Sequence, residues 1–103
     1  MYKLEFLPIA KKDMEDIIFY ISNNLKNQSA AINLSQSFLK SARSILDFPY
    51  GLSEYIPTSK LTKVYRNIKI KKFLMFYTVN EKEKTITVVR VLHQRMDISN
   101  ILE

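Results

Sequence analysis

The stretch VYRNIKIKKFLMFYTVNEKEKTITVVRVLHQRMD, residues Val64–Asp97, decides the fold of this chain. It contains three runs rich in Val, Ile, Thr, Tyr and Phe, with one polar break at Asn80–Lys84. Side chains of this kind fit a pleated, half-buried surface better than they fit a helix. The stretch therefore predicts three consecutive antiparallel strands, with a polar hairpin loop at the break.

The alternation of side chains along these runs predicts what each strand face carries. One face of the first run is strongly basic, and it consists of Tyr65, Asn67, Lys69 and Lys71. The other face is mostly apolar and consists of Val64, Arg66, Ile68 and Ile70. The second run, Phe73–Val79, is apolar on both faces, which is typical of a central strand covered on both sides. The third run, Lys84–Leu92, leads directly into His93.

Upstream of these strands, the pattern predicts one short strand and a first helix. Tyr2–Leu7 alternates apolar and polar residues, and Pro8 ends the run. Apolar residues at helical spacing then predict a helix from about Ala10 to Leu25. We expect three acids in its first turns, where the helix dipole favours negative charge: Asp13, Glu15 and Asp16.

A second apolar stripe predicts a helix from about Ser29 to Phe48, with Ser29 as its N-cap. Pro49 and Gly51 follow its end. Two antiparallel helices with a short link must bury their stripes, and the following sheet is the available surface. The predicted fold is α+β in the order β-α-α-β-β-β, a helical hairpin packed on a small, mainly antiparallel sheet.

Length and composition favour a single domain over all 103 residues. The chain has no cysteine and one histidine, which excludes a disulfide framework, thiolate chemistry and a cysteine- or histidine-rich metal site. We therefore expect no metal and no cofactor. No apolar run is long enough for a signal peptide or a membrane span, so we expect a cytoplasmic protein that does not bind membranes.

The positive charge is concentrated in the last 45 residues, which contain ten basic and four acidic side chains. The first 58 residues contain six of each and sum to zero. Six basic residues follow one another without an acid between them, and we call them the basic stripe: Lys60, Lys63, Arg66, Lys69, Lys71 and Lys72. Such a stripe favours a polyanionic partner, either nucleic acid or an acidic protein segment. The alternative is a solvated edge strand whose lysines discourage edge-to-edge pairing.

Several strings in the chain occur together in one known family. They are Ala10…Asp13…Asp16-Ile17…Tyr20-Ile21, Ala30-Ala31, Leu46…Pro49…Gly51, Tyr65-Arg66, Phe76-Tyr77-Thr78-Val79 and Arg90-Val91-Leu92-His93-Gln94-Arg95-Met96-Asp97. In order and spacing they resemble the RelE/ParE superfamily of small toxins from bacterial type II toxin–antitoxin modules. The resemblance covers nearly the whole chain and implies a plasmid-stabilising toxin that is neutralised by a small antitoxin protein.

The resemblance leaves the target open, because one fold can carry different functions. ParE-like members inhibit DNA gyrase, whereas RelE-like members cut messenger RNA on the ribosome. We favour the ParE-like branch, since long paired helices with Asp16-Ile17 and Ala30-Ala31 are more typical of it. In addition, Leu74 falls where RelE-like enzymes have a phosphate-stabilising arginine, and no tyrosine follows Asp97.

The alternative is a RelE-like, metal-independent endoribonuclease with His93, Arg95 and Lys71 as its catalytic candidates. His93 has an unperturbed pKa suited to proton transfer, and the two cations could stabilise phosphate charge. In a gyrase inhibitor we expect His93 to be a strand-end residue hydrogen-bonded to nearby backbone or to Asp97. A second alternative is a non-catalytic nucleic-acid-binding or regulatory module. Under every reading, the candidate partner- or nucleic-acid-binding residues are Lys63, Arg66, Lys69, Lys71, Lys72 and Arg95.

Overall fold

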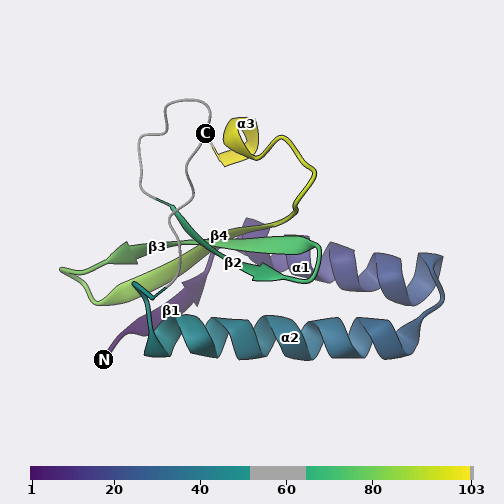
Figure 1. Cartoon of the computed structure of the whole chain (residues 1–103), viewed down its shortest axis with the longest axis horizontal. Helices are drawn as coiled ribbons and strands as arrows, with labels where there is room; N and C mark the ends of the chain where they lie inside the picture. Colours follow the sequence, from purple (N-terminus) through teal and green to yellow (C-terminus); the bar gives the residue numbers. More distant parts are fainter. Residues whose placement is uncertain (52–64, 103) are drawn as a thin grey trace.

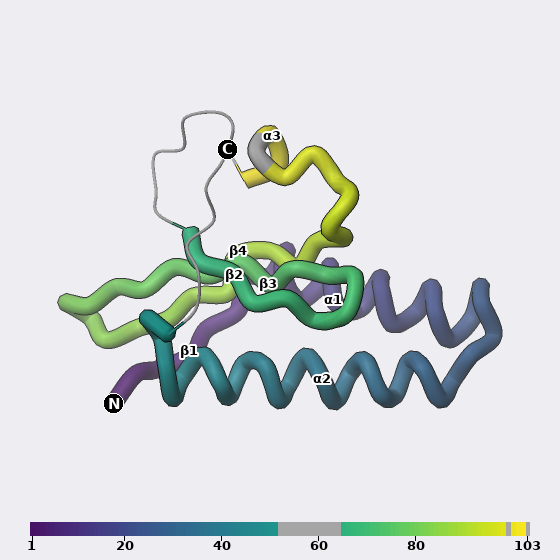
Figure 2. Tube along the Cα trace, viewed as in Figure 1, coloured from purple at the N-terminus to yellow at the C-terminus, as the bar shows by residue number. Residues whose placement is uncertain are grey.

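The computed structural model describes residues 1–51 and 65–102, and it confirms the expected α+β order with one additional helix. In chain order the elements are β1 (Lys3–Phe6), α1 (Pro8–Phe19), the π-helical turn η1 (Tyr20–Asn24), α2 (Gln28–Asp47), β2 (Arg66–Ile70), β3 (Phe73–Asn80), β4 (Thr85–His93) and α3 (Ile98–Leu102). The helices α1 and α2 run antiparallel along one side of the sheet (Figure 1; Figure 2).

The four strands form one sheet in the order β1-β4-β3-β2, so β1 and β2 are its two edges. The pairs β2–β3 and β3–β4 are antiparallel, as predicted, whereas β1 pairs parallel with β4. A two-residue turn, Lys71-Lys72, joins β2 to β3, and the polar stretch Glu81–Lys84 joins β3 to β4. Lys71 was predicted to lie on the basic face of the strand. It lies instead in the turn, with a positive φ of 56°.

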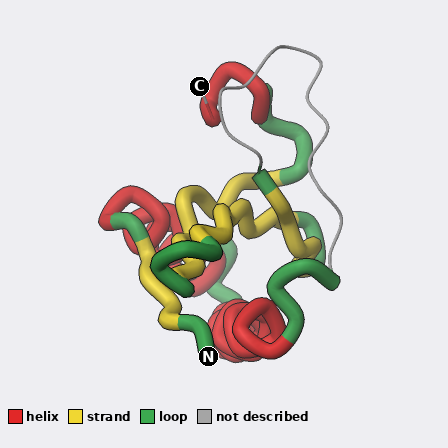
Figure 3. Tube along the Cα trace, turned by 90° about the vertical axis from the view of Figure 1, so that its left-hand side faces the viewer, coloured by secondary structure: helices red, strands yellow, loops and turns green. Residues whose placement is uncertain are grey.

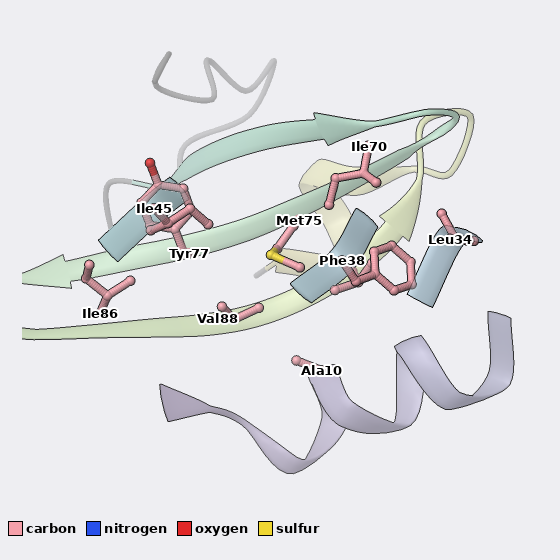
Figure 4. Packing of buried hydrophobic residues seen from close by; sticks show 10 residues of the cluster. Ala10, Leu34, Phe38, Ile45, Ile70, Met75, Tyr77, Ile86 and Val88 are labelled. Carbon is pink, nitrogen blue, oxygen red and sulfur yellow. The ribbon is translucent and has the colours of Figure 1, made fainter. Parts of the chain in front are cut away.

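The main hydrophobic core lies between the helical hairpin and one face of the sheet. Met75 and Tyr77 on β3 and Ile86 and Val88 on β4 are fully buried there, and Ile45 of α2 packs into the same cluster (Figure 4). The Tyr77 hydroxyl donates to the Pro49 carbonyl at 3.0 Å, which satisfies it at the end of α2. The predicted apolar stripes of the two helices therefore cover this face.

The opposite face of the sheet carries a second apolar cluster beneath α3. Its buried members are Phe76, Leu92 and Ile98, and Leu74 packs against them. The Tyr65 hydroxyl also donates to the Leu102 carbonyl at 3.2 Å. Prediction of a central strand covered on both sides is thus confirmed for β3. The helix α3 itself was not predicted, because five residues are too short to show a helical period.

Two predicted helix starts are wrong. The first turn of α1 contains no acid, because the helix already begins at Pro8, a residue tolerated at the first helical position. The N-cap of α2 is Asn27 instead of Ser29, since the Asn27 side-chain oxygen accepts the Ala30 N–H at 3.0 Å. Lys26, with a φ of 51°, ends the first helical segment just before this cap.

Asp13 attaches α1 to the sheet, which explains why this acid lies outside the first turn. β1 ends opposite Val88, and a bulge in β4 follows. Among the described strands, none lies beside the rest of β4 on that side. There Asp13 Oδ2 accepts the Val91 N–H at 3.0 Å and the Arg90 Nε–H at 2.8 Å. Asp13 Oδ1 accepts a third bond from Arg90 Nη2 at 2.9 Å. The Asp13 carboxylate thus supplies the acceptor for a backbone N–H that a neighbouring strand would otherwise supply. Its hydrogen bonds also raise the pKa of Arg90.

Candidate functional site

Four of the predicted binding residues lie at one end of the sheet, and we call them the basic end: Lys69, Lys71, Lys72 and Arg95. The Gln94 N–H donates to the Lys72 carbonyl at 2.9 Å, so the segment after β4 lies against the β2–β3 turn. All four side chains are exposed. Within residues 1–51 and 65–102, no ion pair joins any of the four to an acid, so this end presents concentrated positive charge to a partner.

His93 is the last residue of β4 and lies beside the basic end. Its Nδ1 accepts the backbone N–H of Arg95 at 3.1 Å, and its ring meets Phe73 edge-on at 5.5 Å. Phe73 in turn packs edge-on against Phe38 of α2. The expectation of a strand-end histidine bonded to nearby backbone is confirmed. This geometry orders the turn after β4 and fixes the ring.

The remaining residues of the basic stripe do not join this group. Arg66 begins β2, about 16 Å along an extended strand from Lys71. The guanidinium carbon of Arg66 lies 4.9 Å from the centre of the Tyr50 ring, a cation–π arrangement. Lys60 and Lys63 lie outside the described residues. Of the predicted binding residues that the structure describes, Arg66 therefore lies at the start of β2, and the four residues of the basic end lie near its other end.

Tyr50 belongs to an exposed cluster around Glu81, in the β3–β4 loop. The Glu81 carboxylate accepts the Tyr50 hydroxyl at 2.6 Å and the Tyr2 hydroxyl at 2.7 Å, and it forms an ion pair with Lys84. The bond from Lys84 and those from the two tyrosines lower the pKa of Glu81 to about 2. Its hydrogen bond to Glu81 raises the pKa of Tyr50 to about 12. The cluster connects the N-terminal segment, the end of α2 and the loop.

An apolar groove of about 650 Å³ lies between α1 and α2. Its apolar lining consists of Phe6, Met14, Ile18, Phe19, Phe38 and Leu39. Phe19 and Leu39 are more than half exposed, at 64% and 54%. Sequence reasoning placed an apolar stripe on each helix but could not show which members stay open, because the width of the gap depends on how the helices cross. Exposed apolar surface of this kind is typical of a protein-binding groove.

The described residues, 1–51 and 65–102, contain no group of three or more His, Cys, Asp or Glu side chains that could hold a metal ion. Within the same ranges, no helix combines the length and apolar character needed to cross a membrane.

A helical hairpin on one face of a four-stranded, mainly antiparallel sheet, with a basic sheet end, defines a small RelE/ParE-like α+β domain. The chain belongs to the family described as "ParE toxin of type II toxin-antitoxin system, parDE", which matches residues 4–98. It is therefore a type II toxin–antitoxin toxin of the RelE/ParE superfamily.

Solved structures share this fold at low sequence identity. The chromosomal ParDE system from P. aeruginosa aligns with a TM-score of 0.71 and 17% identity, over 90% of this chain and 96% of that one. The RelBE2 complex from Mycobacterium tuberculosis gives 0.62 and 13%, over 89% and 96%. The isolated E. coli RelE toxin gives 0.56 and 14%, over 98% and 94%. Curated protein sequences contain no match. Both branches of the superfamily thus share this architecture.

Proposed function

We propose that this chain is a ParE-like toxin that inhibits DNA gyrase in the cytoplasm and is neutralised by a small antitoxin. The observation that carries the choice of target is the position of Leu74. This residue stands where RelE-like enzymes have an arginine, and it packs against Phe76 and Leu92 beneath α3. A leucine in an apolar cluster supplies no charge to a phosphate transition state.

The second candidate is a ribosome-dependent mRNA interferase. The observation that favours it is the position of His93 and Arg95 beside Lys71 and Lys72 at the basic end. Against it, the Nδ1 lone pair of His93 already accepts the Arg95 N–H, and the ring rests on Phe73. The neutral ring then carries its proton on Nε2, which leaves no free lone pair for a general base, and residues 98–103 contain no tyrosine to act as a general acid.

For the antitoxin, two surfaces of the chain offer complementary chemistry. The α1–α2 groove suits the apolar side of an amphipathic segment, and the basic end suits its acidic residues. A disordered acidic segment that folds on binding could contact both surfaces, because such segments cover large areas of their partners. Co-expression with the small protein encoded beside this chain is expected to give a soluble complex.

The test of the target is to induce the chain in bacteria and follow DNA and protein synthesis by pulse labelling. We expect DNA synthesis to stop and DNA damage to appear before translation falls. His93→Ala should leave this toxicity unchanged, since a gyrase inhibitor cleaves nothing and its contacts are spread over a surface.

Primer extension on ribosome-bound messages, in the same cultures, separates the two candidates. Cuts inside codons together with prompt translation arrest, both abolished by His93→Ala, would establish the interferase and overturn the gyrase proposal. A catalytic histidine would show itself as a loss of cleavage by orders of magnitude with ribosome binding preserved. Lys82→Ala, in the exposed β3–β4 loop, is the control for expression and folding.

A further inference from the structure

Among the described strands, β1 has β4 on one side and no strand on the other. The backbone N–H and C=O groups of its odd-numbered residues face β4. Lys3 N–H donates to the Lys84 carbonyl at 2.8 Å, and Leu7 N–H donates to the Val88 carbonyl at 2.9 Å. The backbone groups of Tyr2, Leu4 and Phe6 therefore point away from the sheet. In the described part of the chain, β1 has a strand neighbour on one side only, and it lies at the margin of the molecule (Figure 3).

The side chains of β1 alternate in character between its two faces. Tyr2, Leu4 and Phe6 are partly buried and pack against the main core. Lys3 and Glu5 are exposed on the other face, beside Thr85 and Thr87 of β4. The edge thus combines an apolar face with a polar face that carries one positive and one negative charge, two residues apart.

This order of residues is complementary to itself. When two copies of β1 pair antiparallel about a two-fold axis at Leu4, Lys3 of each copy stands opposite Glu5 of the other. On the second face, Leu4 meets Leu4 and Tyr2 meets Phe6. Directly opposite charges of unlike sign and apolar pairs both stabilise an antiparallel ladder. The outward backbone groups of Tyr2, Leu4 and Phe6 are the ones that this register requires as hydrogen-bonding partners.

We propose that the outer edge of β1 is a self-association surface, through which two copies of this chain form a continuous eight-stranded sheet. The neighbouring register, centred on Glu5, would place two glutamates face to face, and like charges in that position are destabilising. The edge β2 is not self-complementary, because Arg66 and Lys69 have no acid on their strand. Of the two edge strands in residues 1–51 and 65–102, β1 alone carries one charge of each sign.

The first experiment measures the mass of the purified 103-residue chain by sedimentation equilibrium over a range of concentrations. We expect a concentration-dependent increase toward twice the 12.1 kDa of one chain. Lys3→Glu and Glu5→Lys, each alone, place like charges opposite each other and should weaken the dimer at least tenfold. Lys69→Glu, the same charge change on β2, is the matched control and should leave the dimer intact. Circular dichroism melting checks that every variant is folded.

The second experiment mixes the two charge variants. A Lys3→Glu chain carries two acids on this face and a Glu5→Lys chain carries two bases, so each pairs with the other but not with itself. We expect monomers in the separate solutions and heterodimers in the mixture, and we expect the Lys3→Glu/Glu5→Lys double variant to dimerise again. A wild-type chain that stays monomeric at every concentration overturns the proposal. A dimer that tolerates both single reversals also overturns it, because another surface would then hold the copies together.

Discussion

The two edge strands of the sheet, β1 and β2, differ in the charges that they carry. β1 is short, pairs parallel with β4 and carries Lys3 and Glu5 on its exposed face. β2 pairs antiparallel with β3, carries no acid and leads into the Lys71-Lys72 turn. The proposed pairing therefore matches opposite charges at β1, whereas β2 offers a second copy only positive charges.

If the proposed pairing of β1 is right, the charge order of an edge strand selects its partner more than its hydrogen-bonding capacity does. Every strand carries the same backbone donors and acceptors, so side-chain charges, which attract or repel at close range, make one edge differ from another. The α+β fold supplies two edges, and the sequence of four or five residues on each makes them chemically distinct. Under the two proposals above, the basic end would contact an acidic antitoxin while β1 contacts a second copy of the chain.

We expect the largest effect, a loss of folding stability, from a substitution in the central strand β3. Met75 on β3 is fully buried in the main core, so Met75→Asp places a charge where water is excluded. We expect a loss of about 5 kcal/mol, which is comparable to the whole stability of a small domain. Lys82→Asp in the exposed loop should change stability by less than about 0.5 kcal/mol. Urea melts of the two variants test this, and equal midpoints would contradict the assignment of β3 as the central strand.

The next effect concerns the place where α1 completes the β1 side of the sheet. Asp13 is 14% exposed and binds both Arg90 and the Val91 N–H, so Asp13→Ala leaves a partly buried cation and an unpaired backbone donor. We expect a loss of about 2–3 kcal/mol. Asp16→Ala breaks the exposed pair with Lys12 on the same helix and should cost less than about 1 kcal/mol. Guanidinium melts compare them, and a smaller loss for Asp13 would show that α1 is held mainly by apolar packing.

A third prediction is that charge reversals at the basic end and at β1 affect different complexes. Lys69→Glu/Lys71→Glu should weaken the complex with the antitoxin by about 10- to 100-fold, or roughly 1.4–2.8 kcal/mol, with the greatest loss at low salt. Self-association through β1 should not change. Lys3→Glu should give the opposite pattern, with normal antitoxin affinity and no dimer. Isothermal titration at two salt concentrations measures the affinities, and unchanged binding by the double reversal would remove the basic end from the antitoxin interface.

The smallest effect concerns the Glu81 cluster, which links the Tyr2 end of β1 through Tyr50 to Arg66 on β2. The pKa of Glu81 is lowered from 4.5 to about 2, so its ionised form is favoured in the folded chain. Its contribution is complete above pH 4.5 and is lost as the pH falls toward 2. Glu81→Gln should therefore flatten the acid side of the stability profile in that range. Identical acid profiles for the two chains would show that the exposed cluster does not couple the edges.

The sequence alone predicted the strands and helices well where the apolar pattern was long. Phe73–Val79 and the stripe of Leu34, Phe38 and Ile45 were recognised because burial selects the same residue types at a regular period. The helix starts were less predictable. Asp13 was predicted to interact with the helix dipole, because its sequence neighbours give no sign that it binds Arg90 and Val91 of β4. Asn27 and Ser29 are both good caps, and the local backbone path selects Asn27.

The candidate site illustrates the same division between local pattern and spatial arrangement. Sequence by itself determined the superfamily and the excess of positive charge in the C-terminal half, since these depend only on residue types and their spacing. Only the tertiary structure decided that Lys69, Lys71, Lys72 and Arg95 share one end while Arg66 stacks on Tyr50 at the other. It also decided that β1 is an open edge. Sheet order and helix crossing bring together residues far apart in the chain, and no local spacing contains that information.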